Sequence, residues 1–220
     1  MRRVAWLSME LPLFPLHLVL FPGRPLPLHI FEPRYRQMLQ DCLERDRRFG
    51  VIAICAGSET GPDAEIFEIG TVAQIEAVDE LPDGRSDIFT RGVERFRLLR
   101  LIPGTPYLKG EVELLEESPA VNNQPQATQL RKLLRCYLAG LGAPREVLER
   151  IPSNPSELAY LAAAAIQVEV PEQQRLLELD STAHRLEAIL RMVRRETGIM
   201  RHLGTVGSLR PPGPCGADLN

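Results

Sequence analysis

The chain has 220 residues, a formal net charge of −3 and a pI of about 5.9. Hydrophobic residues make up 44% of it and charged residues 25%, a composition typical of a globular protein with a sizeable core. The acidic balance argues against a general nucleic-acid binder, and no apolar run reaches the roughly 20 residues of a membrane-spanning helix.

The opening stretch alternates short apolar runs with prolines. The runs Leu11–Leu16, Leu18–Phe21 and Leu26–Phe31 are too short for ordinary helices and predict three short strands. Because proline cannot donate to a ladder, we expect parts of these strands at sheet edges. After Pro33 the period becomes that of an amphipathic helix, whose apolar stripe comprises Tyr35, Met38, Leu39, Cys42 and Leu43.

Further strands follow in the middle of the chain. Phe49–Cys55 predicts a buried strand and Thr71–Val78 a half-buried one, with a polar loop at Ala56–Glu65 between them. The tripeptide Pro82-Asp83-Gly84 predicts a hairpin turn, because proline presets φ and glycine accepts a positive φ.

The β-rich part ends with two more strands. The return strand of the hairpin runs from Ser86 to Leu101, and Gly92 inside it predicts a bulge or bend. A last strand is expected at Leu108–Leu115. Beyond it, Glu116–Gln126 is polar and contains two prolines, which is typical of a boundary between domains.

The remaining pattern is helical. A leucine-rich stripe from Leu130 to Leu141 predicts one helix, and Pro144–Ile151 a short one. Asn154 is the expected N-cap of a third helix, with Pro155 in its first turn. Pro171–Leu177 predicts another short helix.

The last helix has two candidate caps, Asp180 and Ser181, and Gly198 is its expected C-terminal glycine. The chain is therefore expected to be α+β in class. Its predicted parts are an N-terminal extension (1–9, with Met9 an alternative start), a β-rich domain (10–117), a linker (118–126), a helical subdomain (127–203) and a disordered tail (204–220).

Three motifs in order resemble a known family. They are LPLFPLHLVLFPG with LPLHIFEPRYRQML in the opening stretch, FEIGTVAQIEAVDELPDGR at Phe67–Arg85, and the helical segment Ser156–Val193. Together they resemble the N-terminal, substrate-binding domain of Lon proteases, here as a free-standing chain. The resemblance implies a bent β-barrel-like domain of the PUA-like type, followed by a helical bundle.

A search for catalytic chemistry finds no candidate residues. The sequence has no P-loop motif and no nucleophile elbow, so we predict a protein that is not an enzyme. His17, His29, His184 and His202 show no metal-ligand spacing, and we predict neither metal nor cofactor. The four cysteines form no CxxC pair, and buried, reduced thiols indicate the cytoplasm.

The resemblance implies a binding module for unfolded polypeptide, or for a protease or chaperone partner. An RNA-binding module is the alternative, because PUA-like folds include RNA binders, although the acidic pI and scarce aromatic residues count against it. Strand edges and apolar side chains are the physical means of binding a polypeptide. The candidate binding residues are Phe21, His29, Phe31, Arg34 and Tyr35 in the opening stretch.

Overall fold

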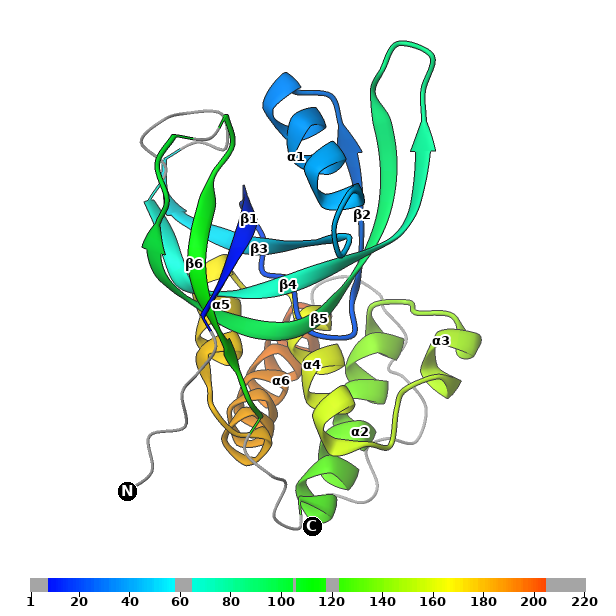
Figure 1. Cartoon of the computed structure of the whole chain (residues 1–220). Coiled ribbons are helices and arrows are strands. Elements are labelled where there is room, and N and C mark those ends of the chain that lie inside the picture. The colour runs from blue at the N-terminus through cyan, green and yellow to red at the C-terminus, as the bar shows by residue number, and fades with distance from the viewer. Residues whose placement is uncertain (1–7, 58–64, 105, 118–122, 205–220) are drawn as a thin grey trace, which may run out of the picture. The chain divides into compact units, whose positions relative to one another are not determined.

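The computed structural model describes residues 8–57, 65–104, 106–117 and 123–204 (Figure 1). The contacts among them form two compact units. The first unit contains the chain up to Glu116 together with Val168–Glu178, and the second contains Glu117–Gln167 and the chain from Leu179 onward. Residues 1–7 of the predicted extension, 58–64 of the predicted loop, 118–122 of the linker and the tail from 205 onward lie outside the described residues.

One mixed sheet forms the first unit. Its described strands are β1 (Met9–Leu16), β2 (Pro25–Ile30), β3 (Arg48–Ala56), β4 (Glu65–Glu80), β5 (Ser86–Leu101) and β6 (Lys109–Leu115). The strand order is β2-β5-β4-β3-β1-β6, and β6 also pairs with β5, so all strands but β2 close into a ring (Figure 1). β2 lies at an edge beside the first half of β5, which confirms the expected edge position of a proline-containing strand.

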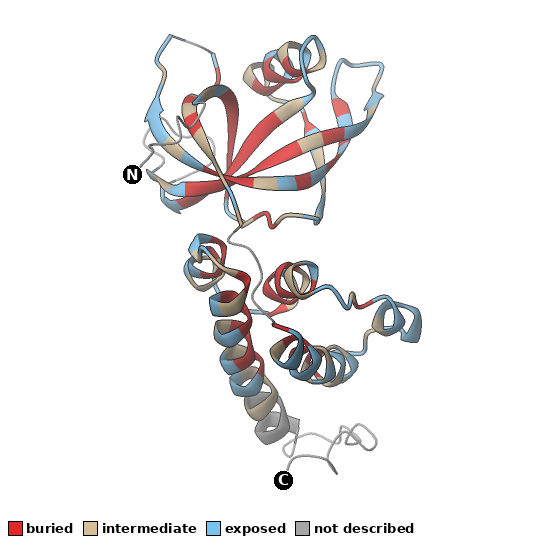
Figure 2. Ribbon diagram, turned by 60° about the horizontal axis from the view of Figure 1, so that its bottom comes forward, coloured by how far each residue is buried: buried red, intermediate tan, exposed pale blue. Residues whose placement is uncertain are grey.

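Side chains of the ring alternate between two apolar clusters. One cluster draws on every strand of the ring and comprises Leu11, Leu13, Ile52, Val72, Phe96 and Val112. The other gathers beneath helix α1 (Pro33–Leu43) and includes Phe14, Phe49, Ile75 and Ile88 together with Tyr35, Met38 and Leu39 of the helix. Neighbours such as Leu13 and Phe14 belong to different clusters because successive side chains of a strand point to opposite faces. The buried positions accordingly run in bands along the strands (Figure 2).

The run Leu18–Phe21 is not a strand, contrary to the sequence prediction. Its backbone is held at single points: Thr71 Oγ1 donates to the carbonyl of Leu20 at 2.6 Å. The turn that follows exchanges two backbone hydrogen bonds with Gly92, where β5 bulges against β4 as predicted. Leu20 and Phe21 are nevertheless buried, so the apolar run fills the core as a loop.

Helix α5 (Val170–Glu178) packs in the first unit although the chain reaches it from the second. Gln174 Nε2 donates to the carbonyl of Ile69 at 3.0 Å, and Arg95 Nη1 donates to the carbonyl of Leu177 at 2.8 Å. Leu176 and Leu177 are both buried. The sequence pattern assigned this helix to the helical subdomain; how the chain divides into separable domains stays a prediction.

The second unit consists of packed helices: α2 (Gln124–Gly140), α3 (Arg145–Glu149), α4 (Pro155–Ala165) and α6 (Thr182–Gly204). The N-cap prediction for Asn154 is confirmed, because its Oδ1 accepts from the backbone nitrogens of Ser156 and Glu157 at 3.0 and 3.1 Å. Of the two predicted caps of α6, Asp180 and Ser181, the structure supports Ser181. Its hydroxyl oxygen accepts a hydrogen bond from the backbone nitrogen of His184 at 3.3 Å.

A buried arginine organises the core of the second unit. Arg185 is fully buried and donates to the carboxylate of Glu117 and to the carbonyl of Leu179. Tyr160 lies beneath the guanidinium, 4.3 Å from ring centre to Cζ, and donates its hydroxyl to Glu117 at 2.6 Å. Thr182 gives Glu117 a further bond at 3.1 Å. The buried charge is thus paired and hydrogen-bonded on several sides, as a buried ion pair requires.

Two further sequence predictions are wrong. α6 continues past Gly198 to Gly204, because a glycine inside a helix costs only about 1 kcal/mol relative to alanine and the flanking pattern stays helical. Cys55 is exposed, not buried, since it lies near the end of β3, where the register with β4 is irregular. Its Sγ donates to the carbonyl of Glu65 at 3.3 Å.

Candidate polypeptide-binding surface

The predicted binding residues divide into core and surface. Phe21 and Tyr35 belong to the core, with 0% and 5% of their surface exposed. The Tyr35 ring stacks on that of Phe14 with the centroids 4.1 Å apart. Neither side chain is open to an incoming polypeptide.

Arg34 is half-buried at the start of α1. Its Nε donates to Glu32 Oε2 at 2.9 Å, and its Cζ lies 4.5 Å from the centre of the Tyr35 ring. Glu32 makes no side-chain hydrogen bond to the backbone of the helix start. Arg34 and Glu32 therefore hold each other, and Arg34 packs on the core beneath it.

His29 and Phe31 are exposed and lie on a face built by three strands. Directly opposed residues of neighbouring strands point to the same side of a sheet. The registers of β4, β5 and β2 thus give two rows across the strands: Asp79, Asp87 and His29, and next to it Ala77, Phe89 and Pro27. All six residues are exposed, and so is Phe31, which follows β2. We call these seven residues the outer face.

Aromatic rings give the outer face its apolar character. Phe31 is 57% exposed and Phe89 is 39% exposed. The rings of His29 and Phe31 lie 6.0 Å apart at an angle of 25°. Adjacent exposed aromatic side chains are typical of an interaction surface.

Ion pairs border the outer face near the hairpin turn. His29 Nδ1 lies 2.6 Å from Asp87 Oδ1, and Arg85 Nη1 lies 3.5 Å from His29 Nε2. Arg85 Nε also donates to Asp83 at 2.6 Å, and this bond lowers the pKa of the Asp83 carboxyl. Arg85 is therefore shared between the turn and the histidine.

The free edge of β2 limits how a strand could be added to it. β2 pairs with β5 on one side, and among the described strands none pairs with its other side. Pro25 and Pro27 carry no N–H, so this edge is poor in donors. A polypeptide lying here would form an incomplete ladder, and we expect contacts with the side chains of the outer face to matter more than main-chain pairing.

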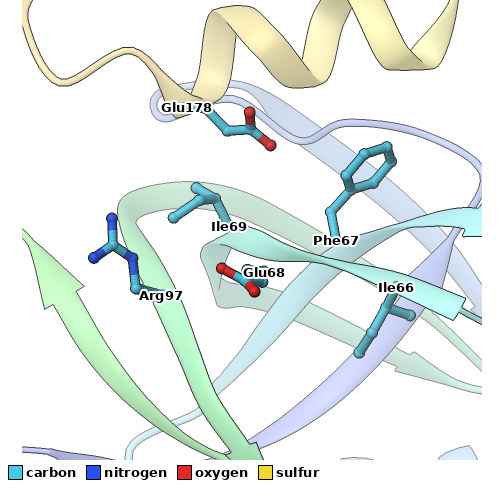
Figure 3. A pocket seen from close by; sticks show the side chains of 6 residues that line it. All are labelled: Ile66, Phe67, Glu68, Ile69, Arg97 and Glu178. Carbon is cyan, nitrogen blue, oxygen red and sulfur yellow. The ribbon is translucent and has the colours of Figure 1, made fainter.

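A concave area apart from the outer face lies between β4, β5 and α5. This open hollow of about 460 Å³ is lined by Ile66, Phe67, Glu68, Ile69, Arg97 and Glu178 (Figure 3). Phe67 and Ile69 point from β4 toward the side of α5, where Glu178 ends the helix (Figure 3). Its lining contains no histidine, cysteine or hydroxyl group.

Reactive side chains elsewhere in the first unit serve packing. Cys42 Sγ donates to the carbonyl of Arg48 at 3.3 Å, and burial raises the pKa of this thiol to about 12, which keeps it protonated. Tyr107 donates to Asp41 Oδ2 at 2.5 Å, and its pKa is raised by burial and by that bond. In the described chain no three His, Cys, Asp or Glu side chains are arranged to hold a metal ion.

Sequence reasoning missed the partners of His29 and Phe31 on the outer face. Phe89, Asp87, Ala77 and Asp79 lie 46 or more residues further along the chain and join the face only through strand register. A usable signal was present for Phe89, because it occupies a polar position in the alternation of β5, between Asp87 and Arg91.

The chain is similar to Lon proteases over most of its length. A family model described as the ATP-dependent protease La (LON) substrate-binding domain matches residues 10–195. Similar proteins include Lon protease of Anaeromyxobacter dehalogenans (strain 2CP-C), 28% identical over 200 residues, and Lon protease 2 of Myxococcus xanthus, 29% identical over 200 residues. Each match covers 87% of this chain but 24% of the relative, so the chain spans about a quarter of the length of these relatives.

Solved structures agree in fold. The crystal structure of a Lon N-terminal domain protein from Xanthomonas campestris is 28% identical, with a TM-score of 0.63 over 83% of this chain and 97% of that chain. The N-terminal domain of Mycobacterium avium complex Lon protease has a TM-score of 0.68 at 19% identity, over 84% and 98%. The α+β fold and the resemblance predicted from the sequence are confirmed. Within the described residues, no helix has the length and apolar character needed to cross a membrane.

Proposed function

Since this chain belongs to the family of the ATP-dependent protease La (LON) substrate-binding domain, we propose that it binds unfolded polypeptide segments on the outer face of its first unit. The observation that carries the proposal is the exposure of Phe31 and Phe89 on one sheet face. Apolar side chains that are buried in folded proteins become available in unfolded ones, and these two rings offer them a contact.

The affinity should be modest. An unfolded segment loses chain entropy when it is ordered, and the proline-containing edge of β2 provides few donors to compensate. We expect dissociation constants in the micromolar range, about −8 kcal/mol. We further propose that the role is binding and not catalysis, with the bound segment presented to a protease or chaperone partner.

The carboxylates of the outer face argue against RNA binding as a second function. Asp79 and Asp87 lie on the same exposed face as Phe31 and Phe89. Phosphate groups passing over this face would meet two carboxylates, and RNA-binding surfaces are characteristically basic.

The proposal is tested by fluorescence anisotropy of a labelled, reduced and alkylated model protein titrated with the intact chain. The double variant Phe31→Ala/Phe89→Ala should weaken binding about tenfold, the loss of two aromatic contacts. The matched control is Leu99→Ala/Leu101→Ala, which removes two equally exposed apolar groups from the other end of β5 and should leave binding unchanged. No binding at protein concentrations well above micromolar, or equal losses in both double variants, would reject the proposal.

A further inference from the structure

We propose that the outer face selects extended segments in which a lysine or arginine lies two residues from an aromatic side chain. This inference rests on the proposed function and adds a substrate class to it. It derives from the two carboxylates in the row formed by Asp79, Asp87 and His29. It also derives from the distance between that row and the row that contains Phe89.

The first observation is a pair of like charges. Asp79 of β4 and Asp87 of β5 are directly opposed in the strand register, and both are exposed. Like charges directly opposite each other destabilise a pair of strands. A cation placed over both carboxylates would relieve this repulsion, so the row is complementary to a basic side chain.

Three nearby arginines are engaged by other partners. Arg85 is bound to Asp83, and at the other end of the outer face Arg91 Nε donates to Glu76 Oε1 at 2.6 Å. Arg34 is held by Glu32. His29 contacts Asp87, the nearer carboxylate of the row. Among the described residues, Asp79 forms no ion pair, which leaves this carboxylate to attract a cation from a bound segment.

The second observation is the distance between the two rows. Asp87 and Phe89 are two residues apart on β5, as are Asp79 and Ala77 on β4. Two residues of a strand span about 6.8 Å. An extended client running along β5 repeats this spacing, because its side chains i and i+2 point to the same side. An aromatic side chain over Phe89 and Pro27 therefore places the side chain at i+2 over Asp87 and Asp79.

Adjacent placement of the two groups does not satisfy this geometry. In an extended segment, residues i and i+1 point to opposite sides. A basic residue directly next to the aromatic one would point away from the carboxylates when the aromatic ring faces Phe89. Selectivity should therefore depend on the order of residues as well as on composition.

The test uses four fluorescent 11-residue peptides that share one background and differ at two central positions. They carry Phe-x-Lys, Phe-x-Gln, Phe-x-Glu, or Phe directly followed by Lys with Gln at the next position. Anisotropy titrations with the intact chain at low salt should show Phe-x-Lys binding about threefold tighter than Phe-x-Gln and about tenfold tighter than Phe-x-Glu, the range of one or two exposed ion pairs. The adjacent Phe-Lys peptide should bind like Phe-x-Gln. The preference should shrink in 0.5 M salt, where charges are screened over a few ångströms.

Variants separate charge selectivity from binding itself. Asp79→Asn/Asp87→Asn should bring the ratio of the Phe-x-Lys affinity to the Phe-x-Gln affinity from about three to about one. The matched control Glu65→Gln/Glu68→Gln removes two exposed carboxylates of β4 that lie off the outer face and should keep the preference. Equal binding of all four peptides by the unmodified chain would reject the selectivity and leave polypeptide binding in place. Absence of binding by every peptide would reject both.

Discussion

The ring of Phe96 on β5 fills the space that a side chain on Gly70 of β4 would need. The two residues are directly paired in the strand register. A Cβ on Gly70 would stand 2.5 Å from Cζ of the ring and 2.5 Å from the carbonyl oxygen of Val51. The same ring lies 2.8 Å from the place of a Cβ on Gly50 of β3. Two glycines on neighbouring strands thus make room for one aromatic ring inside the ring of strands.

Substituting these glycines should destabilise the chain to different degrees. We expect Gly70→Ala and Gly50→Ala each to lower the free energy of unfolding by about 1–3 kcal/mol, the range for an overpacked core. Gly70→Ala should be the more damaging, because one of its clashes is with backbone. Phe96→Leu should therefore compensate Gly50→Ala better than Gly70→Ala in urea unfolding experiments.

A glycine with open space around it provides the control. Nothing lies within 4 Å of a Cβ on Gly198 in α6. Gly198→Ala should raise the free energy of unfolding by up to about 1 kcal/mol, the difference in helix propensity. If all three substitutions had the same effect, the packing explanation for Gly70 and Gly50 would be wrong.

Removal of the buried arginine of the second unit should be costly. Arg185→Met leaves the Glu117 carboxylate without its cation and the Leu179 carbonyl without its donor. We expect a loss of about 3–5 kcal/mol, as for breaking one side of a buried ion pair. Adding Glu117→Gln should recover part of that loss. Arg145→Met, which breaks an exposed pair with Glu149 at 2.7 Å, should cost less than about 0.5 kcal/mol.

The Tyr107–Asp41 hydrogen bond predicts a pH-dependent contribution to stability. The bond lowers the pKa of Asp41, so the folded state favours the charged carboxylate. Its contribution is therefore complete above the unfolded pKa of about 3.9 and is lost as the pH falls through the lower folded value. Tyr107→Phe should cost about 1 kcal/mol at pH 7, and this difference should shrink progressively below pH 4 in thermal or urea unfolding.

A second tyrosine serves as a comparison for that measurement. Tyr137 accepts a hydrogen bond from the backbone nitrogen of Gln167 at 3.1 Å, with no carboxylate in that bond. Tyr137→Phe should therefore cost a similar amount at pH 7, with a difference that does not follow the titration of a carboxylate. A Tyr107→Phe effect that stayed constant from pH 7 to pH 2 would contradict the assignment.

The division into units predicts which shortened chains fold. A chain ending at Glu117 lacks α5, so the surface against which Leu176 and Leu177 are buried would be exposed. The comparison is a chain that ends at Glu178 and in which a long Gly/Ser linker replaces Glu117–Gln167, so that α5 is kept. The chain that ends at Glu117 should bind more of a hydrophobic dye than this comparison chain, and it should unfold at a lower urea concentration. Equal stability of the two would show that α5 contributes nothing to the first unit.

Catalytic assays should give no turnover. The sequence contains no Gly-Lys pair, so the lysine of a P-loop has no counterpart in it. We expect neither ATP hydrolysis nor cleavage of casein by the purified chain, measured by phosphate release and by gel electrophoresis. Turnover that followed the chain through successive chromatography steps would contradict this expectation.

Local patterns predicted most elements because their causes are local. The return strand Ser86–Leu101 has the bounds of β5, and its Gly92 forms the expected bulge. The Asn154 cap depends on atoms at most three residues away. In contrast, Leu18–Phe21 has the composition of a strand but its backbone is held by Thr71 and Gly92, which lie far along the chain. No local pattern encodes such partners.

The candidate surface was predictable only in part for the same reason. His29 and Phe31 stand out in the opening stretch, but their neighbours Phe89 and Asp79 are fixed by the pairing of three strands. From the sequence, Tyr35 was predicted to lie on the apolar stripe of a helix and was also named as a candidate binding residue. The structure buries it against Phe14, because a helix stripe faces the core.

The interruption of the first unit has a consequence for synthesis on the ribosome. When β6 has emerged from the ribosome, all described strands of the sheet are available, yet 51 residues from Glu117 to Gln167 must still emerge before the segment that carries α5. At about 5–20 residues per second, that delay lasts several seconds. During this interval the nascent sheet presents uncovered apolar surface around Ile69 and Arg95, and α2, α3 and α4 of the second unit can form before α5. Nascent-chain complexes stalled just before residue 168 should accordingly recruit chaperones more strongly than complexes stalled well after residue 178.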